Sequence, residues 1–165
     1  MADLANKGWL KVPGIRPLGD RTLEEQMIGL DKALAECAGK TVLDLGCAEG
    51  LIGREFAKAG AIDVHGIELL ENHLAVARKA CKGYKQMRFT RSHLLDYILL
   101  HSTEHLVSEQ YDIVLALGII HKLEDPNIPM RYAARSAKSL VCFRAPARIS
   151  AGTLQVSWLC FALTI

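Results

Sequence analysis

The sequence predicts an α/β fold: a three-layer sandwich in which helices flank a doubly wound, mostly parallel sheet. Short apolar runs alternate along the chain with longer segments of helical periodicity, which is the pattern of consecutive β-α units. The run YDIVLAL at 111–117 is almost continuously apolar, as expected for a central parallel strand buried on both faces. With 165 residues, half of them apolar and 23% charged, the chain fits a single globular domain spanning residues 1–165.

The first part of this domain, residues 1–38, is predicted to be a lead-in followed by a helix. Residues 1–21 contain prolines and glycines that favour extended or turning backbone. Thr22 and Glu25 have the spacing of a capping box, in which each side chain accepts a hydrogen bond from the other residue's backbone. The helix is therefore expected to begin after Thr22 and to end near Ala38, just before a glycine.

The core of the domain is predicted to span residues 40–146, with five strands separated by helices. Asn72 is expected to cap the helix that follows the second strand. The predicted strands are 41–45, 64–68, 87–91, 111–117 and 140–144, and the predicted helices are about 51–59, 73–82, 94–105 and 128–138.

The stretch TVLDLGCAEGLIG, Thr41 to Gly53, predicts a strand, a tight turn and a helix, the first unit of a Rossmann-type nucleotide-binding sheet. The glycine spacing differs from the G-x-G-x-x-G of dinucleotide folds, and Glu49 stands where a pyrophosphate needs neutral amides. This disfavours an NAD-dependent oxidoreductase. Asp44 and Glu49 instead favour a cationic ligand such as S-adenosylmethionine (SAM), which has a sulfonium and an ammonium group but no phosphate.

The segment DLGCAEG resembles motif I of the class I SAM-dependent methyltransferases, with Ala48 in place of the middle glycine. Further matches follow in family order over roughly residues 40–146. The resemblance implies a Rossmann-like methyltransferase core that binds SAM, transfers its methyl group and releases S-adenosylhomocysteine. It also implies a set of cofactor-binding residues: Asp44, Gly46, Cys47, Ala48, Gly50, Glu68, Leu69, Leu95, Asp96, Leu117 and Gly118.

Three acidic residues are central to this site. Asp44 is expected to hold the amino-acid portion of SAM. Glu68 ends the second strand, roughly 20 residues after the turn, where a carboxylate can accept hydrogen bonds from both ribose hydroxyls. By resemblance, Asp96 accepts from the adenine amine, with Leu95 or Tyr97 against the ring.

The loop after the fourth strand, LALGIIHKLEDP, resembles the family segment that faces the transferred methyl group. His121 is the candidate catalytic residue, because an imidazole can take a proton from an acceptor hydroxyl or amine. A structural histidine is an equally good interpretation of this position. The lead-in could also cover the cofactor, with Glu25 and Gln26 as possible contacts.

Other sequence features narrow the possible functions. A net charge of +2 gives no clear nucleic-acid or membrane signature, and no spacing of ligands predicts a metal site. No secretion signal is evident, and the cysteines form no C-x-x-C pair, so a reduced, cytoplasmic protein is expected. The five cysteines are Cys37, Cys47, Cys81, Cys142 and Cys160.

The uncharged segment 149–165 is expected to form one apolar strand, beside the strand at 140–144. The family core usually continues further, so the fold is expected to be shortened at its C-terminus, with an exposed sheet edge that another subunit covers. A SAM-binding module without methyl transfer is therefore the alternative to an enzyme. The acceptor is not specified by the sequence, and its near-neutral charge slightly favours a small molecule.

Overall fold

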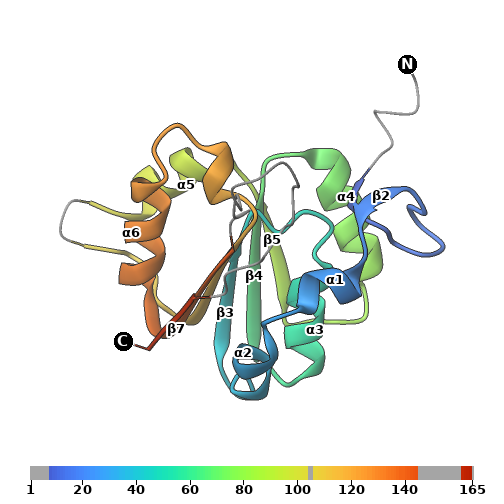
Figure 1. Cartoon of the computed structure of the whole chain (residues 1–165), viewed down its shortest axis with the longest axis horizontal. Coiled ribbons are helices and arrows are strands. Elements are labelled where there is room, and N and C mark those ends of the chain that lie inside the picture. The colour runs from blue at the N-terminus through green and yellow to red at the C-terminus, as the bar shows by residue number, and fades with distance from the viewer. Residues whose placement is uncertain (1–7, 104–105, 145–160, 165) are drawn as a thin grey trace, which may run out of the picture.

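The computed structural model describes residues 8–103, 106–144 and 161–164 (Figure 1). Its centre is a six-stranded sheet in which all neighbouring strands are parallel except the last pair. The strands, in sheet order, are β5 (Met87–Arg91), β4 (Asp63–Glu68), β3 (Thr41–Leu45), β6 (Tyr111–Leu117), β7 (Ala137–Arg144) and β8 (Phe161–Thr164).

Helices cover both faces of this sheet, which confirms the predicted three-layer α/β fold (Figure 1). One apolar layer packs α5 and α6 on the sheet, and the other packs α2 and α3 on the opposite face. The helical elements are α1 (Leu23–Met27), α2 (Asp31–Ala35), α3 (Leu51–Lys58), α4 (Glu71–Ala80), α5 (Leu94–His101), the 3-10 turn η2 (Ile120–Lys122) and α6 (Asn127–Ser136).

The strand order places the ligand site. From β3 the chain proceeds outward through β4 and β5, and then returns to the other side of β3 as β6. Crossovers on the two sides of β3 therefore diverge, which leaves a crevice at the carboxyl ends of β3 and β6. The glycine turn after β3 and the loop after β6 both lie at this edge.

The predicted helix at 22–38 is wrong in its extent. Thr22 and Glu25 do form the capping box, but α1 ends at Met27 and α2 begins at Asp31. Gly29, between the two helices, has a φ of 80°, which a continuing helix does not allow. The guanidinium of Arg144 donates to main-chain oxygens at the end of α1, and so satisfies carbonyls that helix continuation would otherwise use.

The lead-in contains regular structure that the sequence did not predict. β1 (Gly8–Leu10) and β2 (Gly19–Arg21) pair in parallel as a separate two-stranded sheet. A Cβ at Gly19 would lie 2.4 Å from the main-chain carbon of Leu10, so this close approach requires glycine.

Several predicted boundaries also shift. β4 begins at Asp63, one residue before the prediction, and α5 ends at His101 rather than 105. The chain leaves α6 at Ser136 and enters β7 directly, three residues earlier than predicted. Asn72 lies inside α4 and does not cap it; the carboxylate of Glu68 instead accepts the Leu70 N–H, 2.9 Å away.

β8 lies antiparallel beside β7, the position predicted for the C-terminal strand. The remainder of the predicted strand, from 149 to 160, falls outside the described residues. Within the part of the chain that the structure describes, no helix is long and apolar enough to cross a membrane.

Candidate functional site

The turn between β3 and α3 uses backbone conformations that most residues avoid. Gly46, Ala48 and Gly50 all have positive φ, at 77°, 46° and 70°. A left-handed conformation is unfavourable for alanine by roughly 1–2 kcal/mol. The N–H of Ala48 donates to Glu68 Oε2 at 3.0 Å, and this charge-assisted hydrogen bond helps to hold the strained residue.

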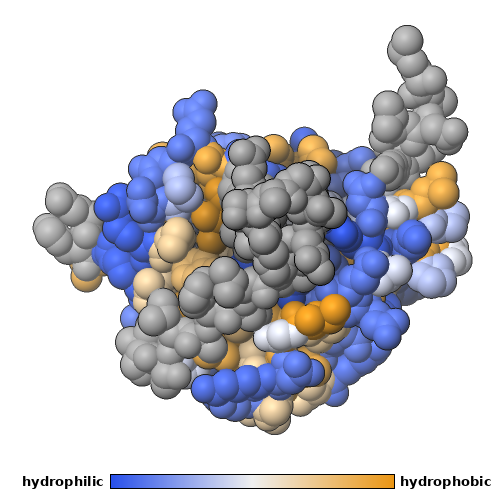
Figure 2. Space-filling view, viewed as in Figure 1, coloured by the Kyte–Doolittle hydropathy of each residue, from blue (hydrophilic) through white to orange (hydrophobic). Residues whose placement is uncertain are grey.

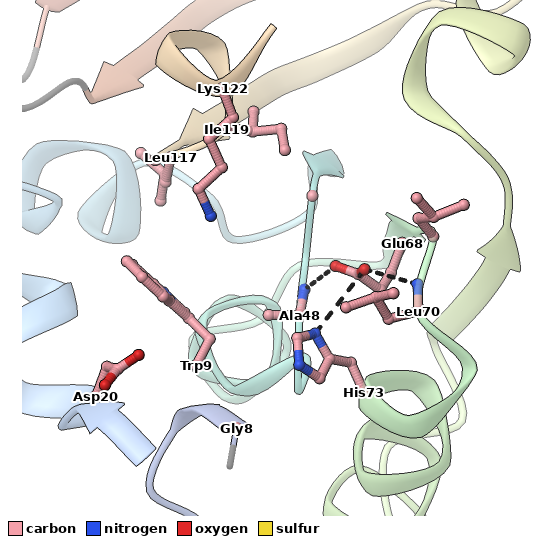
Figure 3. Close-up of a pocket in the computed structure, with 13 residues that line it drawn as sticks. Gly8, Trp9, Asp20, Ala48, Glu68, Leu70, His73, Leu117, Ile119 and Lys122 are labelled. Atoms are coloured by element: carbon pink, nitrogen blue, oxygen red, sulfur yellow. Dashed lines mark hydrogen bonds and ion pairs between the residues drawn. The ribbon is translucent and has the colours of Figure 1, made fainter. Parts of the chain in front are cut away.

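The turn borders a cavity of about 370 Å³, which a smaller one of about 200 Å³ adjoins (Figure 3). The combined space lies within the range of small-molecule sites. The two cavities share Gly46, Glu68, Leu69, Ile119 and Lys122. The larger cavity is also lined by Gly8, Trp9, Asp20, Ala48, Leu70, His73, Leu117 and Gly118, and the smaller one by Ile67, Ser92, His93, Leu94 and Leu123.

Glu68 lies at the end of β4 with its carboxylate on the cavity wall (Figure 3). Its oxygens accept hydrogen bonds from the amides of Ala48 and Leu70, and the His73 ring is 3.9 Å away. Burial acts to raise the pKa of Glu68, but the His73 ring and the two amides together lower it below its ordinary value. Glu68 is therefore ionised at neutral pH and can accept further hydrogen bonds from a ligand.

Asp44 lies beneath the turn and does not line the cavity. Its side chain is buried, and Oδ2 has no hydrogen-bond partner among the described residues. Burial, and then the negative charge of Glu68, raise the pKa of Asp44 to about 7. A buried carboxylate without a partner is unfavourable, so Asp44 favours a cationic or hydrogen-bond-donating group at this place.

Glu49 does not face the ligand site, so the expectation that it attracts a cationic ligand is wrong. Its side chain is fully buried and points to β1, where it accepts the N–H groups of Trp9 at 2.8 Å and Leu10 at 3.0 Å. Arg16 Nη1 is 3.2 Å from Oε1, and His73 Nε2 is 3.8 Å away. The carboxylate thus fastens β1 to the glycine turn.

The lead-in borders the cavity, but through residues other than those predicted. Gly8, Trp9 and Asp20, from β1 and β2, contribute to its wall. Glu25 is exposed and takes part in the capping box, whereas Gln26 is buried against Arg144 of β7. We refer to residues 8–21, which contain β1 and β2, as the cover segment.

The structure places the other predicted site residues as follows. Leu69, Leu117 and Gly118 line the larger cavity together with the turn residues Gly46 and Ala48. Cys47 and Gly50 belong to the turn but do not line either cavity; they pack against neighbouring strands instead. A Cβ on Gly66 would lie 2.6 Å from the Cys47 sulfur, and one on Gly50 would lie 2.9 Å from the Phe89 ring. Burial raises the pKa of the Cys47 thiol well above its ordinary value, so Cys47 acts as an uncharged packing group.

Leu95 and Asp96 do not line either cavity. Both lie in the first turn of α5, where Asp96 is exposed to solvent. Because α5 begins at Leu94, the residues just before and at its start, Ser92 to Leu94, are the ones that face the smaller cavity. Tyr97, the alternative ring contact, is buried in the core under α5.

His121 lies in the turn η2, and its side chain is outside what the structure describes, so its catalytic role stays a prediction. Seven residues that line the larger cavity were not predicted as site residues: Gly8, Trp9, Asp20, Leu70, His73, Ile119 and Lys122. Trp9 and Lys122 come from distant segments, and their proximity depends on the position of the cover segment. Among the described residues, no group of three potential ligands could hold a metal ion.

Residues 37–147 match the model of the methyltransferase domain family. The chain belongs to this family. It is 32% identical, over 142 residues, to the ubiquinone biosynthesis O-methyltransferase of Azoarcus sp. (strain BH72), an alignment that covers 83% of this chain and 55% of that protein. The chain thus spans about half the length of the curated relatives that it matches.

Solved structures agree with this assignment. A SAM-dependent methyltransferase from Thiobacillus denitrificans, in complex with S-adenosylhomocysteine, superposes with a TM-score of 0.57 at 20% identity, covering 74% of this chain and 48% of that one. A SAM-dependent methyltransferase from Mesorhizobium loti gives a TM-score of 0.56 at 25% identity, with coverages of 79% and 61%. The class I SAM-dependent methyltransferase fold that the motifs implied is therefore confirmed.

The buried carboxyl of Asp44 makes stability depend on pH in a direction that can be measured. Burial raises the pKa of this carboxyl from 3.8 to about 7, so the unfolded chain releases the proton before the folded chain does, and the protein loses stability as the pH rises from about 4 to about 7. Asp44→Asn should therefore increase stability at pH 8 by roughly 1–3 kcal/mol, and at pH 5 by a smaller amount. Urea unfolding at both pH values tests this, with the exposed Asp31→Asn as control; a variant that is less stable at pH 8 would contradict it.

The carboxylate of Glu49 should determine how firmly the cover segment is held. Glu49→Gln keeps the shape but removes a buried charge that pairs with Arg16, so we expect a loss of about 2–3 kcal/mol in stability. Hydrogen exchange at the Trp9 and Leu10 amides should become much faster. The matched control is Glu55→Gln, which alters only a surface ion-pair cluster on α3; unchanged protection in Glu49→Gln would show that other contacts hold the cover.

Proposed function

We propose that this chain is a SAM-dependent methyltransferase that acts on an oxygen atom of a small molecule and forms S-adenosylhomocysteine. The observation that supports this most directly is the ionised Glu68 on the cavity wall, next to the glycine turn at the switch point of the sheet. The curated relatives with the printed name ubiquinone biosynthesis O-methyltransferase support an oxygen acceptor and a small molecule.

The residues present fit SAM. The Glu68 carboxylate on the cavity wall suits a ligand with a positively charged amino-acid portion, and the buried Asp44 carboxyl beneath the turn has an oxygen without a partner among the described residues. The turn keeps its backbone accessible at Gly46, where a Cβ would lie 3.1 Å from Ile119 and would narrow the space between the cavity walls. Neither feature would favour a diphosphate, since Asp44 and Glu68 both place negative charge at this end of the sheet.

In this proposal each part of the cavity binds a different part of SAM. A carboxylate has about four acceptor positions, so Glu68 can bind two ribose hydroxyls in addition to the amides it already accepts. Ile67, Leu94 and Leu123 provide apolar walls for the adenine ring in the smaller cavity. Leu117 and Gly118, at the end of β6, are left to border the reacting end of the ligand.

SAM supplies the chemistry, an electrophilic methyl group on a sulfonium. The chain's own contribution is to align the acceptor with this methyl and to exclude water, because methyl transfer depends mainly on orientation. The cover segment contributes by adding Trp9 to the wall above the turn. Whether His121 takes the proton of the acceptor hydroxyl remains a proposal that rests on its place in the loop after β6.

Calorimetric titration with S-adenosylhomocysteine tests the binding site. The wild type should bind at micromolar concentrations, and Glu68→Ala should weaken binding at least tenfold, because the ribose loses two charge-assisted hydrogen bonds. Glu71→Ala is the matched control. Glu71 is an exposed carboxylate in the first turn of α4, and it pairs with Arg78. Equal affinities for the two variants would contradict the assignment of Glu68.

A SAM-binding module that does not transfer the methyl group is the second candidate. The specific observation in its favour is the length of the match, since the chain spans about half of the curated relatives. Incubation with SAM and a panel of phenolic and alcoholic acceptors separates the two functions. Formation of S-adenosylhomocysteine that depends on the acceptor supports the enzyme, whereas tight binding without turnover supports the module.

We also propose that a second copy of the chain covers the sheet edge at β8, and that the protein works in the cytoplasm. The edge position of β8 and the four buried free thiols in the described residues support these proposals. Sedimentation equilibrium at micromolar concentration should give the mass of a dimer. A stable monomer would overturn the first of them.

A further inference from the structure

Lys122 has an unusual position for a lysine that is exposed to solvent. It extends from η2, and its Nζ lies 4.8 Å from the centroid of the Trp9 ring, at the mouth of the larger cavity (Figure 3). The Trp9 ring in turn packs close to Gly118, where a Cβ would lie 3.8 Å from the ring. The ring and the ammonium group therefore come from opposite walls and meet above the end of β6.

The electrostatic partner of this lysine is a ring face, not an anion. A cation–π contact at an exposed site is worth only about 0.5–1 kcal/mol. Within the part of the chain that the structure describes, no carboxylate oxygen forms an ion pair with Lys122 within 4 Å. Because this contact is weak, the ammonium group of Lys122 can move from the Trp9 ring to an incoming anion at little cost in free energy.

The cavity has two ends of different character (Figure 3). Glu68, Leu70 and His73 lie at one end, where the proposed function places the ribose. Trp9, Leu117 and Lys122 lie at the other, beside the loop after β6. If the ribose is bound at Glu68, the reacting group and the acceptor must approach from the Trp9 side.

We propose that Trp9 and Lys122 form the acceptor subsite and that they select a planar aromatic ring with an ionisable hydroxyl group. This inference rests on the proposed methyltransferase function. The acceptor ring lies against the indole of Trp9, and the ammonium of Lys122 leaves that indole to pair with the acceptor oxygen. Lys122 thereby stabilises the oxyanion and makes the oxygen a stronger nucleophile.

The bonds that form and break in the reaction are consistent with this role of Lys122. The acceptor hydroxyl first loses its proton to a base, either water or the His121 imidazole of the proposed function. The oxyanion then forms the new oxygen–carbon bond, while the carbon–sulfur bond breaks and its electron pair stays on sulfur. Lys122 remains protonated throughout, so it acts by charge and is not the proton acceptor.

On the face shown in Figure 2, hydrophobic patches alternate with hydrophilic surface among the described residues. The indole offers area for stacking, and the lysine is exposed beside it. A neutral aliphatic acceptor would gain from neither group, so the subsite discriminates by ring and by charge.

The test uses 4-nitrophenol as a probe, because its phenolate absorbs visible light and reports its own protonation. The full chain is saturated with S-adenosylhomocysteine, and the absorbance of the bound probe is titrated with pH. An ammonium group close to the oxygen should lower the probe's apparent pKa by about one unit, a tenfold change in its ionisation constant. Lys122→Met should abolish this shift, and Lys122→Arg should restore most of it.

Three control variants make the result specific. Lys85→Met removes an exposed lysine that precedes β5 and should leave the shift unchanged. Trp9→Leu should weaken probe binding about tenfold, whereas Trp9→Phe should retain most of it, because a ring is kept. Urea unfolding midpoints of all variants should agree with the wild type, apart from a modest decrease for Trp9→Leu.

Several results would overturn the proposal. One is a full shift retained in Lys122→Met, and another is a wild type that binds S-adenosylhomocysteine but does not bind the probe. A tenfold loss of S-adenosylhomocysteine affinity in Lys122→Met would assign the lysine to the carboxylate of that ligand instead. A wild type that does not bind S-adenosylhomocysteine at all would contradict the proposed function itself, and calorimetry distinguishes that failure from the others.

Discussion

The buried carboxylate of Glu49 is the interaction on which the arrangement of the site depends. A fully buried charge is unfavourable unless several donors satisfy it, and here two amides of β1 and the Arg16 guanidinium do so. Since Glu49 belongs to the glycine turn, these bonds attach the cover segment to the same few residues that form the floor of the cavity. Arg16 also donates to the main chain of Asn72 in α4, so three separate segments are fixed together.

The site carries the negative charge that the sequence predicted, but different residues supply it. Glu49 is neutralised by Arg16, and it contributes little negative potential to the cavity. Asp44 and Glu68 take its place: burial, and then the negative charge of Glu68, raise the pKa of Asp44 to about 7, whereas Glu68 stays ionised. A cationic ligand would relieve this repulsion, so the preference for SAM over a diphosphate follows from two carboxylates at the ends of adjacent strands.

Local patterns were sufficient to predict the five parallel strands of the central sheet and the glycine turn, though not β1 and β2, because apolar runs and glycines act over a few residues. Thr41–Leu45 and Tyr111–Leu117 are strands with the predicted ends, and Glu68 lies on the cavity wall. The break between α1 and α2 was not predictable in this way, since it involves Arg144, which is 118 positions from Gln26. Leu95 and Asp96 do not line the smaller cavity, whereas Ser92 to Leu94 do, because the start of one helix decides which side chains face a cavity.

Cofactor binding and methyl transfer depend on different parts of this chain. The wall that we propose for the cofactor is built from the ends of β3, β4 and β6 and the start of α5, all within the region that matches the methyltransferase domain. Transfer further requires that an acceptor oxygen be held in line with the methyl group, and a small misplacement there lowers the rate strongly. The fold therefore supports the binding half of the function on its own, whereas in our proposal the reaction depends on how Trp9, outside the matched region, and Lys122, in the loop after β6, position the acceptor.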